Sequence, residues 1–397
     1  MDLIPTPGQV VSAVGNLAHQ LVHGGVADLR PMPRTVLEEG PHREVHHYRP
    51  AASAPQQGDP VLLVAPLAAP ALCYDLRRGC SLVEHLVEQG RPTYLVEYGA
   101  VAVRDPEVGV GPWVDDVVPR AIEAASEHAG GRPVHVVGWS LGGILGLLTA
   151  ADRPDLPIAS VSALGSPTDV SLVPLMAPAR PPLGLTEGGG LIPRTYRAVS
   201  AVPVPLVPWV LQLSSVQRLV TRPLAFAAHL DDADLLAQLE AVDRFTDAMT
   251  AYPSRSFGQV YHRFLPGNAL VDGAMTLGSR EISLSAITAP VLVLAGATDT
   301  LAPVAAVRAV LPHLSGSREP RFEIVPGGHL GLLTGRAART GTWAVLDDWI
   351  DEWSGGVPAP PAKKTRKKPA KKTASRGSIG SNPTRRYGSA DSRALGR

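Results

Sequence analysis

The stretch Val134-His-Val-Val-Gly-Trp-Ser-Leu-Gly-Gly-Ile-Leu145 decides the fold of this 397-residue chain. Its first four residues form an apolar run, which is typical of a strand buried on both faces of a parallel sheet. Gly138 and Gly142 allow a sharp turn without Cβ clashes, and Gly143 lets the following apolar helix pack close to the strand. The segment therefore predicts a strand, a tight turn that carries Ser140, and a helix.

Similar apolar runs recur along the chain, with helical stretches between most of them. Further strands are expected at 34–39, 43–48, 61–65, 94–98, 159–163, 291–295 and 322–325. Helices are expected at 9–22, 81–88, 113–128, 141–151, 303–311 and 342–353. Strands that alternate with helices predict an α/β fold, with a mostly parallel central sheet and helices on both of its faces.

A serine hydroxyl is a poor nucleophile, so Ser140 needs a base to remove its proton and a group that orients the base. Asp299 directly follows the strand expected at 291–295, and His329 follows the last strand between glycines. Both lie where side chains project from the carboxyl edge of the sheet. Asp299 also fits an N-cap ahead of Pro303, and Asp169 is the reserve candidate for the acid.

The chain order Ser140, Asp299, His329 is that of a catalytic triad in the α/β-hydrolase fold. His329 would take the serine proton, and Asp299 would hold the imidazole. The backbone N–H of Leu141 is one expected oxyanion donor, and position alone suggests Leu67 as the second. His135, inside the strand before the turn, is expected to be packed and not catalytic.

The domain organisation expected from the sequence has three parts. Residues 1–58 form an N-terminal helix and edge strands, 59–354 form the catalytic domain, and 355–397 form a disordered basic tail. Residues 167–285 lack the strand-helix rhythm and are expected to be a cap over the site, with a helix near 232–249.

Charge divides the chain unequally. Residues 356–397 carry 12 Lys or Arg and one acid, which leaves a net charge of −10 on the rest. The basic tail predicts either a solvated segment or contact with an anionic lipid, an inclusion surface or nucleic acid. The uncharged stretch 198–216 contains three prolines and is not expected to cross a membrane.

The N-terminus and the cysteines predict a cytoplasmic protein, whose basic tail is a candidate for contact with inclusions or membranes. The N-terminus lacks the features of an export signal, and Cys73 and Cys80 are expected to be reduced, buried thiols. Clustered metal-ligand spacings and phosphate-binding glycine loops are both missing, so neither a metal nor an organic cofactor is expected. The sequence gives no indication of oligomeric state.

Over roughly residues 40–352 the chain resembles the polyhydroxyalkanoate synthases and their hydrolase relatives. The resemblance rests on the segments 60–66, 75–84, 113–120, 268–273, 278–290, 299–303 and 328–331. It implies the α/β-hydrolase fold and gives Asp299 and His329 the acid and base roles. It also implies a cysteine nucleophile, whereas this chain has Ser140.

The serine shifts the expected chemistry toward hydrolysis. A thiolate exchanges acyl groups readily with thioesters, whereas a seryl ester is typically resolved by water or another alcohol. We expect an esterase-like or lipase-like serine hydrolase, and the apolar stretch from Ala201 to Leu213 in the cap favours apolar acyl or lipid esters. The alternatives are a synthase-like acyltransferase that uses hydroxyacyl-CoA and a non-catalytic protein that binds an inclusion or other surface.

Overall fold

The computed structural model describes residues 8, 11–16, 25–67, 69–98, 110–173, 230–251 and 270–355. Residues 1–360 form one compact unit. The predicted basic tail lies outside the described residues except for Gly355, and so does the apolar stretch from Ala201 to Leu213. Of the predicted helix at 9–22, residues 11–16 are described and are helical.

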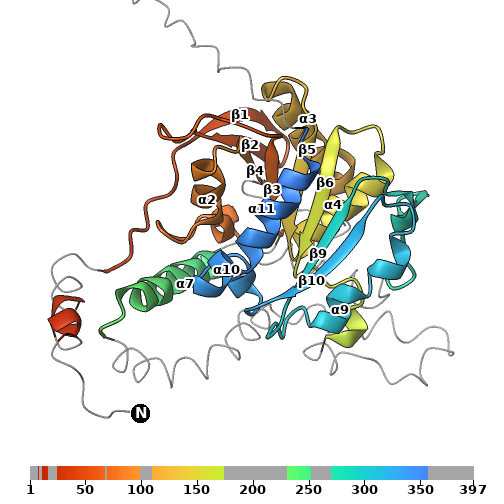
Figure 1. Cartoon of the computed structure of the whole chain (residues 1–397). Helices are drawn as coiled ribbons and strands as arrows, with labels where there is room; N and C mark the ends of the chain where they lie inside the picture. Colours follow the sequence, from red (N-terminus) through yellow and green to blue (C-terminus); the bar gives the residue numbers. More distant parts are fainter. Residues whose placement is uncertain are drawn as a thin grey trace, which may run out of the picture. The chain divides into compact units, whose positions relative to one another are not determined.

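An eight-stranded sheet forms the centre of this unit, in the order β1-β2-β4-β3-β5-β6-β9-β10 (Figure 1). Only β2 runs antiparallel to its neighbours, and all other pairings in this sheet are parallel. The strands are β1 (Arg34–Gly40), β2 (Arg43–Tyr48), β3 (Val61–Val64), β4 (Thr93–Glu97), β5 (Val134–Trp139), β6 (Ile158–Leu164), β9 (Val291–Gly296) and β10 (Pro320–Val325). This arrangement confirms the predicted α/β-hydrolase fold.

Helices cover both faces of the sheet. On one face α3 and α4 pack against each other and against β5, and on the other His85 of α2 stacks on Trp343 of α11. The main helices are α2 (Leu82–Glu88), α3 (Val118–His128), α4 (Leu141–Asp152), α7 (Ala233–Ala251), α9 (Val304–Arg308), α10 (Arg336–Thr340) and α11 (Thr342–Trp353). A π-helical turn, η2 (Trp113–Val117), precedes α3 directly.

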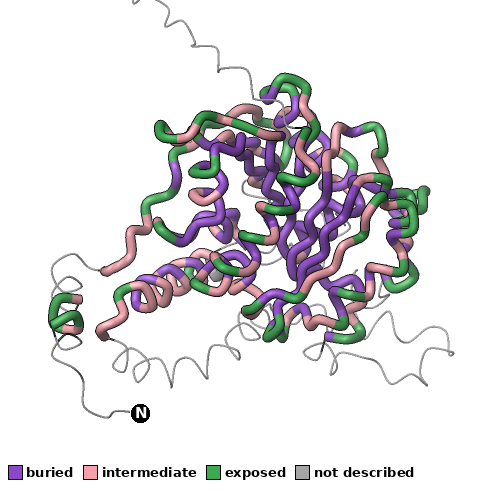
Figure 2. Tube along the Cα trace, viewed as in Figure 1, coloured by how far each residue is buried: buried purple, intermediate pink, exposed green. Residues whose placement is uncertain are grey.

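The central strands are buried along their whole length, as the apolar runs predict. Every residue of β3, β5 and β9 is buried, and the strands form the purple centre of Figure 2. In contrast, β1 lies at one edge of the sheet and alternates between intermediate and exposed residues. The strand β2 was expected at an edge too, but it pairs with both β1 and β4, so only β1 is an edge strand there.

The described part of the predicted cap contains more regular structure than the sequence indicated. The helix α7 matches the helix expected near 232–249. A two-stranded antiparallel sheet, β7 (Ala274–Leu277) and β8 (Arg280–Ser283), was not expected. No helix in the described ranges is long and apolar enough to span a membrane, and residues 198–216 lie outside those ranges.

Candidate active site

Ser140 lies at the turn between β5 and α4, in a backbone conformation that side chains rarely adopt. Its φ is 55° and its ψ is −124°. Only one other non-glycine residue among those described, His42, has a positive φ. Such strain persists where the surroundings enforce it, and it is concentrated at functional sites.

Glycines make this turn possible because backbone atoms occupy the space that a Cβ would need. A Cβ on Gly142 would collide with the carbonyl oxygen of Val64, and one on Gly138 would collide with the backbone of Gly142 and Gly143. The start of α4 therefore packs directly on the end of β3. The glycine pattern read from the sequence has this steric cause.

A buried tyrosine holds the turn from below. The Tyr74 hydroxyl donates to the carbonyl of Val64 at 2.8 Å and accepts the backbone N–H of Trp139 at 2.9 Å. Burial raises the pKa of Tyr74 well above its ordinary value, so the hydroxyl stays protonated and able to donate. The Ser140 N–H donates to the carbonyl of Leu164 at 2.8 Å. Sequence reasoning missed Tyr74, because it lies more than sixty residues before the turn.

Asp299 and His329 meet at the carboxyl edge of the sheet. The Nδ1 of His329 lies 2.8 Å from Oδ2 of Asp299, whose carboxylate is fully buried. The other carboxylate oxygen accepts the N–H groups of Leu301 and Ala302, at 2.9 and 2.8 Å. Because Nδ1 faces the Asp299 carboxylate, the tautomer that fits carries its proton on Nδ1. This tautomer leaves Nε2 of His329 free to accept a proton.

The reserve candidate, Asp169, has a different structural role. Its side chain accepts the N–H of Ser171 at 2.9 Å and caps the short 3-10 helix η3 (Val170–Leu172). The structure pairs His329 with Asp299. The N-cap role expected for Asp299 ahead of Pro303 is not observed, because the N-cap of α9 is Pro303 and the Asp299 carboxylate accepts the N–H groups of Leu301 and Ala302 in the turn before it.

His329 is held by the residue next to Ser140. The indole N–H of Trp139 donates to the carbonyl oxygen of His329 at 3.0 Å, and the two rings lie 4.8 Å apart between centroids. Gly165 is close to the pair, because a Cβ there would lie 3.4 Å from both Asp299 Oδ2 and His329 Nδ1. No hydrogen bond joins Ser140 Oγ to His329 among the described residues. Such bonds often form only when substrate binds.

The two expected oxyanion donors lie at the start of α4 and in the turn after β3, two segments that are in contact at Gly142 and Ala65. Leu141 is the first residue of α4, and Leu67 lies in the turn after β3; both are buried. Neither N–H has a hydrogen-bond partner among the described residues. The carbonyl of Ala65, two residues before Leu67, accepts the Tyr98 hydroxyl at 2.7 Å. The roles of Leu67 and Leu141 remain predictions.

The helix α7 brings apolar surface to this site. Phe245 of α7 lies 6.4 Å from the Trp139 ring between centroids and is buried. The helix is attached by Asp234, which pairs with Arg77 at 2.6 Å and with Arg339 at 3.0 Å. Burial alone would raise the pKa of Asp234, but hydrogen bonds from Arg77 and Arg336 outweigh it and lower the pKa.

The two cysteines take no part in this arrangement. Both are free and buried, as expected. Cys80 Sγ accepts the N–H of Gly335 at 2.8 Å, and burial raises the pKa of Cys73 well above its ordinary value. Their environment is that of inert, packed thiols.

Several curated proteins are similar to the chain over most of its length. It is 22% identical over 341 residues to the poly(3-hydroxyalkanoate) polymerase subunit PhaC of Allochromatium vinosum, with 85% of this chain and 94% of that protein covered. The PhaC subunit of Thiocystis violacea is 21% identical over 352 residues, with 86% and 95% covered. That of Cupriavidus necator is 31% identical over 137 residues, with 32% and 22% covered. No established protein-family model matches the chain.

Solved structures align with the chain at low sequence identity. An esterase from Thermogutta terrifontis aligns with a TM-score of 0.48 and 14% identity, covering 81% of this chain and 99% of that one. A proline iminopeptidase from Mycobacterium smegmatis gives 0.44 and 16%, covering 81% and 98%. The fold assignment rests on the strand order and directions described above. The chain is an α/β-hydrolase-fold protein that resembles poly(3-hydroxyalkanoate) polymerase subunits over most of its length.

Proposed function

We propose that the chain is a serine hydrolase that cleaves carboxylic esters through an acyl-enzyme, with Ser140, His329 and Asp299 as its triad. One observation carries the proposal. A serine in a strained turn between strand and helix directly follows Trp139, which is hydrogen-bonded to a histidine whose Nδ1 is hydrogen-bonded in turn to a buried carboxylate. A buried acid on Nδ1 fixes the imidazole with Nε2 available as the base.

The first half of the reaction forms the acyl-enzyme. His329 Nε2 accepts the hydroxyl proton as Ser140 Oγ attacks the ester carbonyl carbon, and the carbonyl oxygen becomes an oxyanion. The N–H groups of Leu141 and Leu67 stabilise that charge. When the intermediate collapses, the bond to the alcohol oxygen breaks and this oxygen takes the proton from His329.

The second half returns the enzyme to its starting state. His329 removes a proton from water, and the hydroxide oxygen attacks the acyl carbon on Ser140. The Oγ–acyl bond breaks, Oγ recovers the proton from His329, and the carboxylic acid leaves. Asp299 stays ionised throughout and stabilises the imidazolium that forms in each half.

We infer apolar acyl groups as substrates. Trp139 and the cap-helix residue Phe245 place two large rings beside the turn that carries Ser140. Both residues are buried, so the surroundings of the turn are apolar, and an apolar lining favours alkyl chains over charged groups. With p-nitrophenyl esters of increasing chain length, we expect kcat/KM to rise from acetate to medium acyl chains. An optimum at acetate would contradict the inference.

Labelling with a fluorophosphonate tests the nucleophile, because only an activated serine reacts. We expect stoichiometric labelling of the intact chain and none of Ser140→Ala. Ser162→Ala is a matched control, since Ser162 is a buried serine on the neighbouring strand β6 whose hydroxyl has no hydrogen-bond partner among the described residues. Labelling that survives in Ser140→Ala would overturn the proposal.

A synthase-like acyl transfer is the second candidate, because the relatives are named polymerase subunits. Offering a 3-hydroxyacyl-CoA to the enzyme separates the two. Free 3-hydroxy acid with no growing polymer supports hydrolysis, whereas polymer that depends on Ser140 would support transfer. Fluorophosphonate labelling without either product would leave esters of other alcohols as the class to assay.

A further inference from the structure

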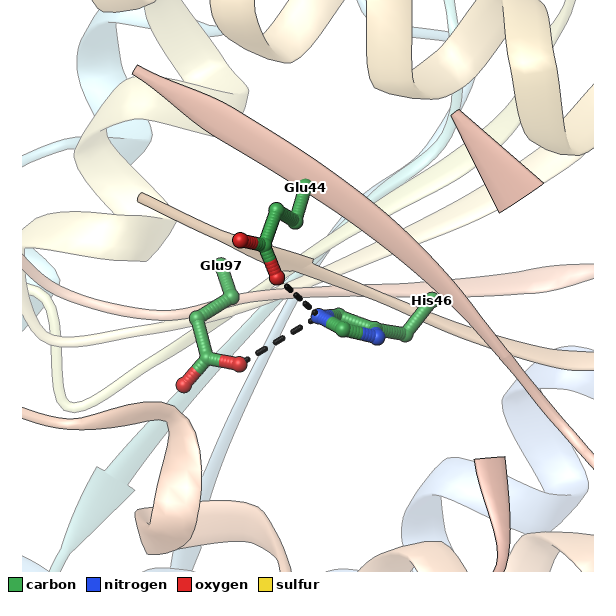
Figure 3. A group of neighbouring side chains, drawn as sticks. All are labelled: Glu44, His46 and Glu97. Carbon is green, nitrogen blue, oxygen red and sulfur yellow. Dashed lines mark ion pairs between the residues drawn. The ribbon is translucent and has the colours of Figure 1, made fainter. Parts of the chain in front are cut away.

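A second cluster of polar side chains lies on β2 and β4, which are separated from β5 by β3 in the sheet order, and Figure 3 shows its three members. Glu44 and His46 belong to β2, and Glu97 is the last residue of β4. Residues two apart on a strand share a face, and Glu44 is the direct cross-strand partner of Glu97. All three side chains therefore project from one face of the sheet.

Two carboxylates directly opposite each other on neighbouring strands repel unless a cation lies between them. Arg34 neutralises part of this negative charge, because its guanidinium lies 2.7 Å from Oε2 of Glu97. With one arginine and two glutamates, the group keeps a net charge of −1. A cation between the three side chains would balance the cluster.

The imidazole of His46 is directed into this space. Its Nε2 lies 3.2 Å from Oε2 of Glu44 and 3.3 Å from Oε2 of Glu97. The residue is only 5% exposed, yet neither ring nitrogen makes a hydrogen bond within the described part of the chain. A buried polar group without a hydrogen bond is unfavourable, and a ligand bound between the three side chains would satisfy the imidazole.

The two distances from His46 Nε2 to the carboxylates, 3.2 and 3.3 Å, match those between ligands of one metal ion. Zinc binds histidine nitrogen and carboxylate oxygen at ~2.0–2.2 Å in tetrahedral geometry, which places neighbouring ligand atoms ~3.3 Å apart. The three ligand atoms here all lie within 4.8 Å of one another. One imidazole and two carboxylates are also a ligand set that first-row divalent metals accept.

We propose that Glu44, His46 and Glu97 bind a divalent transition-metal ion, with Zn²⁺ as the preferred occupant. The side chain of Glu44 is 45% exposed, which gives the ion access and leaves room for water as a further ligand. This site was not predicted from the sequence, because Glu44 and His46 alone are a common strand pattern and Glu97 is far away in the chain.

The expected effect of the ion is structural. It would join β2 to the end of β4, where Tyr98 follows directly. The Tyr98 hydroxyl donates to Ala65 in the loop that carries Leu67, so the site is connected to the oxyanion loop through two residues. The proposal does not depend on the hydrolase function.

Isothermal titration of the full-length, chelator-treated protein with Zn²⁺ tests the site. We expect one ion per chain, and binding at least ~10-fold weaker in His46→Ala. His47→Ala is the matched control, because His47 is the next residue on the same strand and packs on the other face against Tyr94 and His128. Its affinity for Zn²⁺ should equal that of the wild type.

A thermal melt adds a second readout. Zn²⁺ should raise the melting temperature of the wild type and of His47→Ala but not that of His46→Ala. If His46→Ala does not fold, Glu44→Gln replaces it, because Glu44 is partly exposed and its amide keeps the shape. An absence of stoichiometric Zn²⁺ binding in the wild type, or affinity unchanged in His46→Ala and Glu44→Gln, would overturn the proposal.

Discussion

Trp139→Phe tests whether the residue beside the nucleophile positions the catalytic histidine. The change removes the indole N–H that donates to the His329 carbonyl at 3.0 Å and keeps an aromatic ring for contact with Phe245. His329 follows Gly327 and Gly328 in the chain, and glycines leave a loop free to adopt other conformations. The indole is the side chain that fixes the backbone of His329 directly.

The size of the effect follows from the bond that is lost. A hydrogen bond of this kind contributes ~1 ± 0.5 kcal/mol net, and each 1.36 kcal/mol in the barrier corresponds to about tenfold in rate. If the lost energy is expressed in the position of His329, kcat/KM for an ester should fall about 2- to 13-fold. The fluorophosphonate labelling rate should fall by a similar factor, because it depends on the same base.

Trp343→Phe is the matched control. The indole N–H of Trp343 donates to the Leu333 carbonyl at 3.1 Å, and its ring stacks on His85 at 4.9 Å. Both tryptophans are 4% exposed. Trp343→Phe therefore makes the same chemical change close to the loop that carries His329, but at a residue whose indole is hydrogen-bonded to Leu333 and not to His329. We expect comparable losses in the free energy of unfolding from the two variants and slower labelling only in Trp139→Phe.

Equal labelling rates in the two variants would refute a positioning role for Trp139. A loss of activity in proportion to the loss of folded protein would do the same. Circular dichroism on the labelling samples separates these outcomes, because it measures the folded fraction directly.

Two further predictions concern the strand and helix that flank Ser140. Burial lowers the pKa of His135 from 6.5 to about 3. The unfolded chain therefore gains a proton below about pH 6.5 that the folded chain does not. The free energy of unfolding consequently decreases as the pH is lowered. From about pH 7 to about pH 5 this amounts to about 2 kcal/mol, so His135→Gln should show a correspondingly smaller drop in urea unfolding. Gly142→Ala should abolish labelling and lower the melting temperature, since its Cβ would collide with the Val64 carbonyl; normal labelling would contradict the packing described.

The elements that sequence reasoning located are those whose signal is local. A strand buried on both faces is mostly apolar, so β3 and β9 are visible as continuous apolar runs and β5 as a run interrupted by His135. The signal for the turn at Ser140 is equally local. Its glycines are required by close backbone contacts within a few residues and with the adjacent strand. Asp299 could be placed because it follows such a strand.

The contacts that support the site are not local, and the sequence did not indicate them. Tyr74 reaches the turn from an earlier 3-10 helix, and its phenol looks like any core tyrosine in the sequence. Arg77 pairs with Asp234 across more than 150 residues. A polar side chain carries no mark of its partner, so only the three-dimensional structure distinguishes these residues from ordinary surface or core positions.

The same contacts bear on the choice between hydrolysis and acyl transfer. The turn is held through backbone groups: the N–H of Ser140 bonds to Leu164, and the N–H of Trp139 bonds to Tyr74. The Ser140 hydroxyl makes no hydrogen bond among the described residues, so the turn does not require an oxygen at that atom. A thiol would fit the same backbone. The geometry therefore supports either nucleophile, and the preference for hydrolysis comes from the chemistry of the seryl ester.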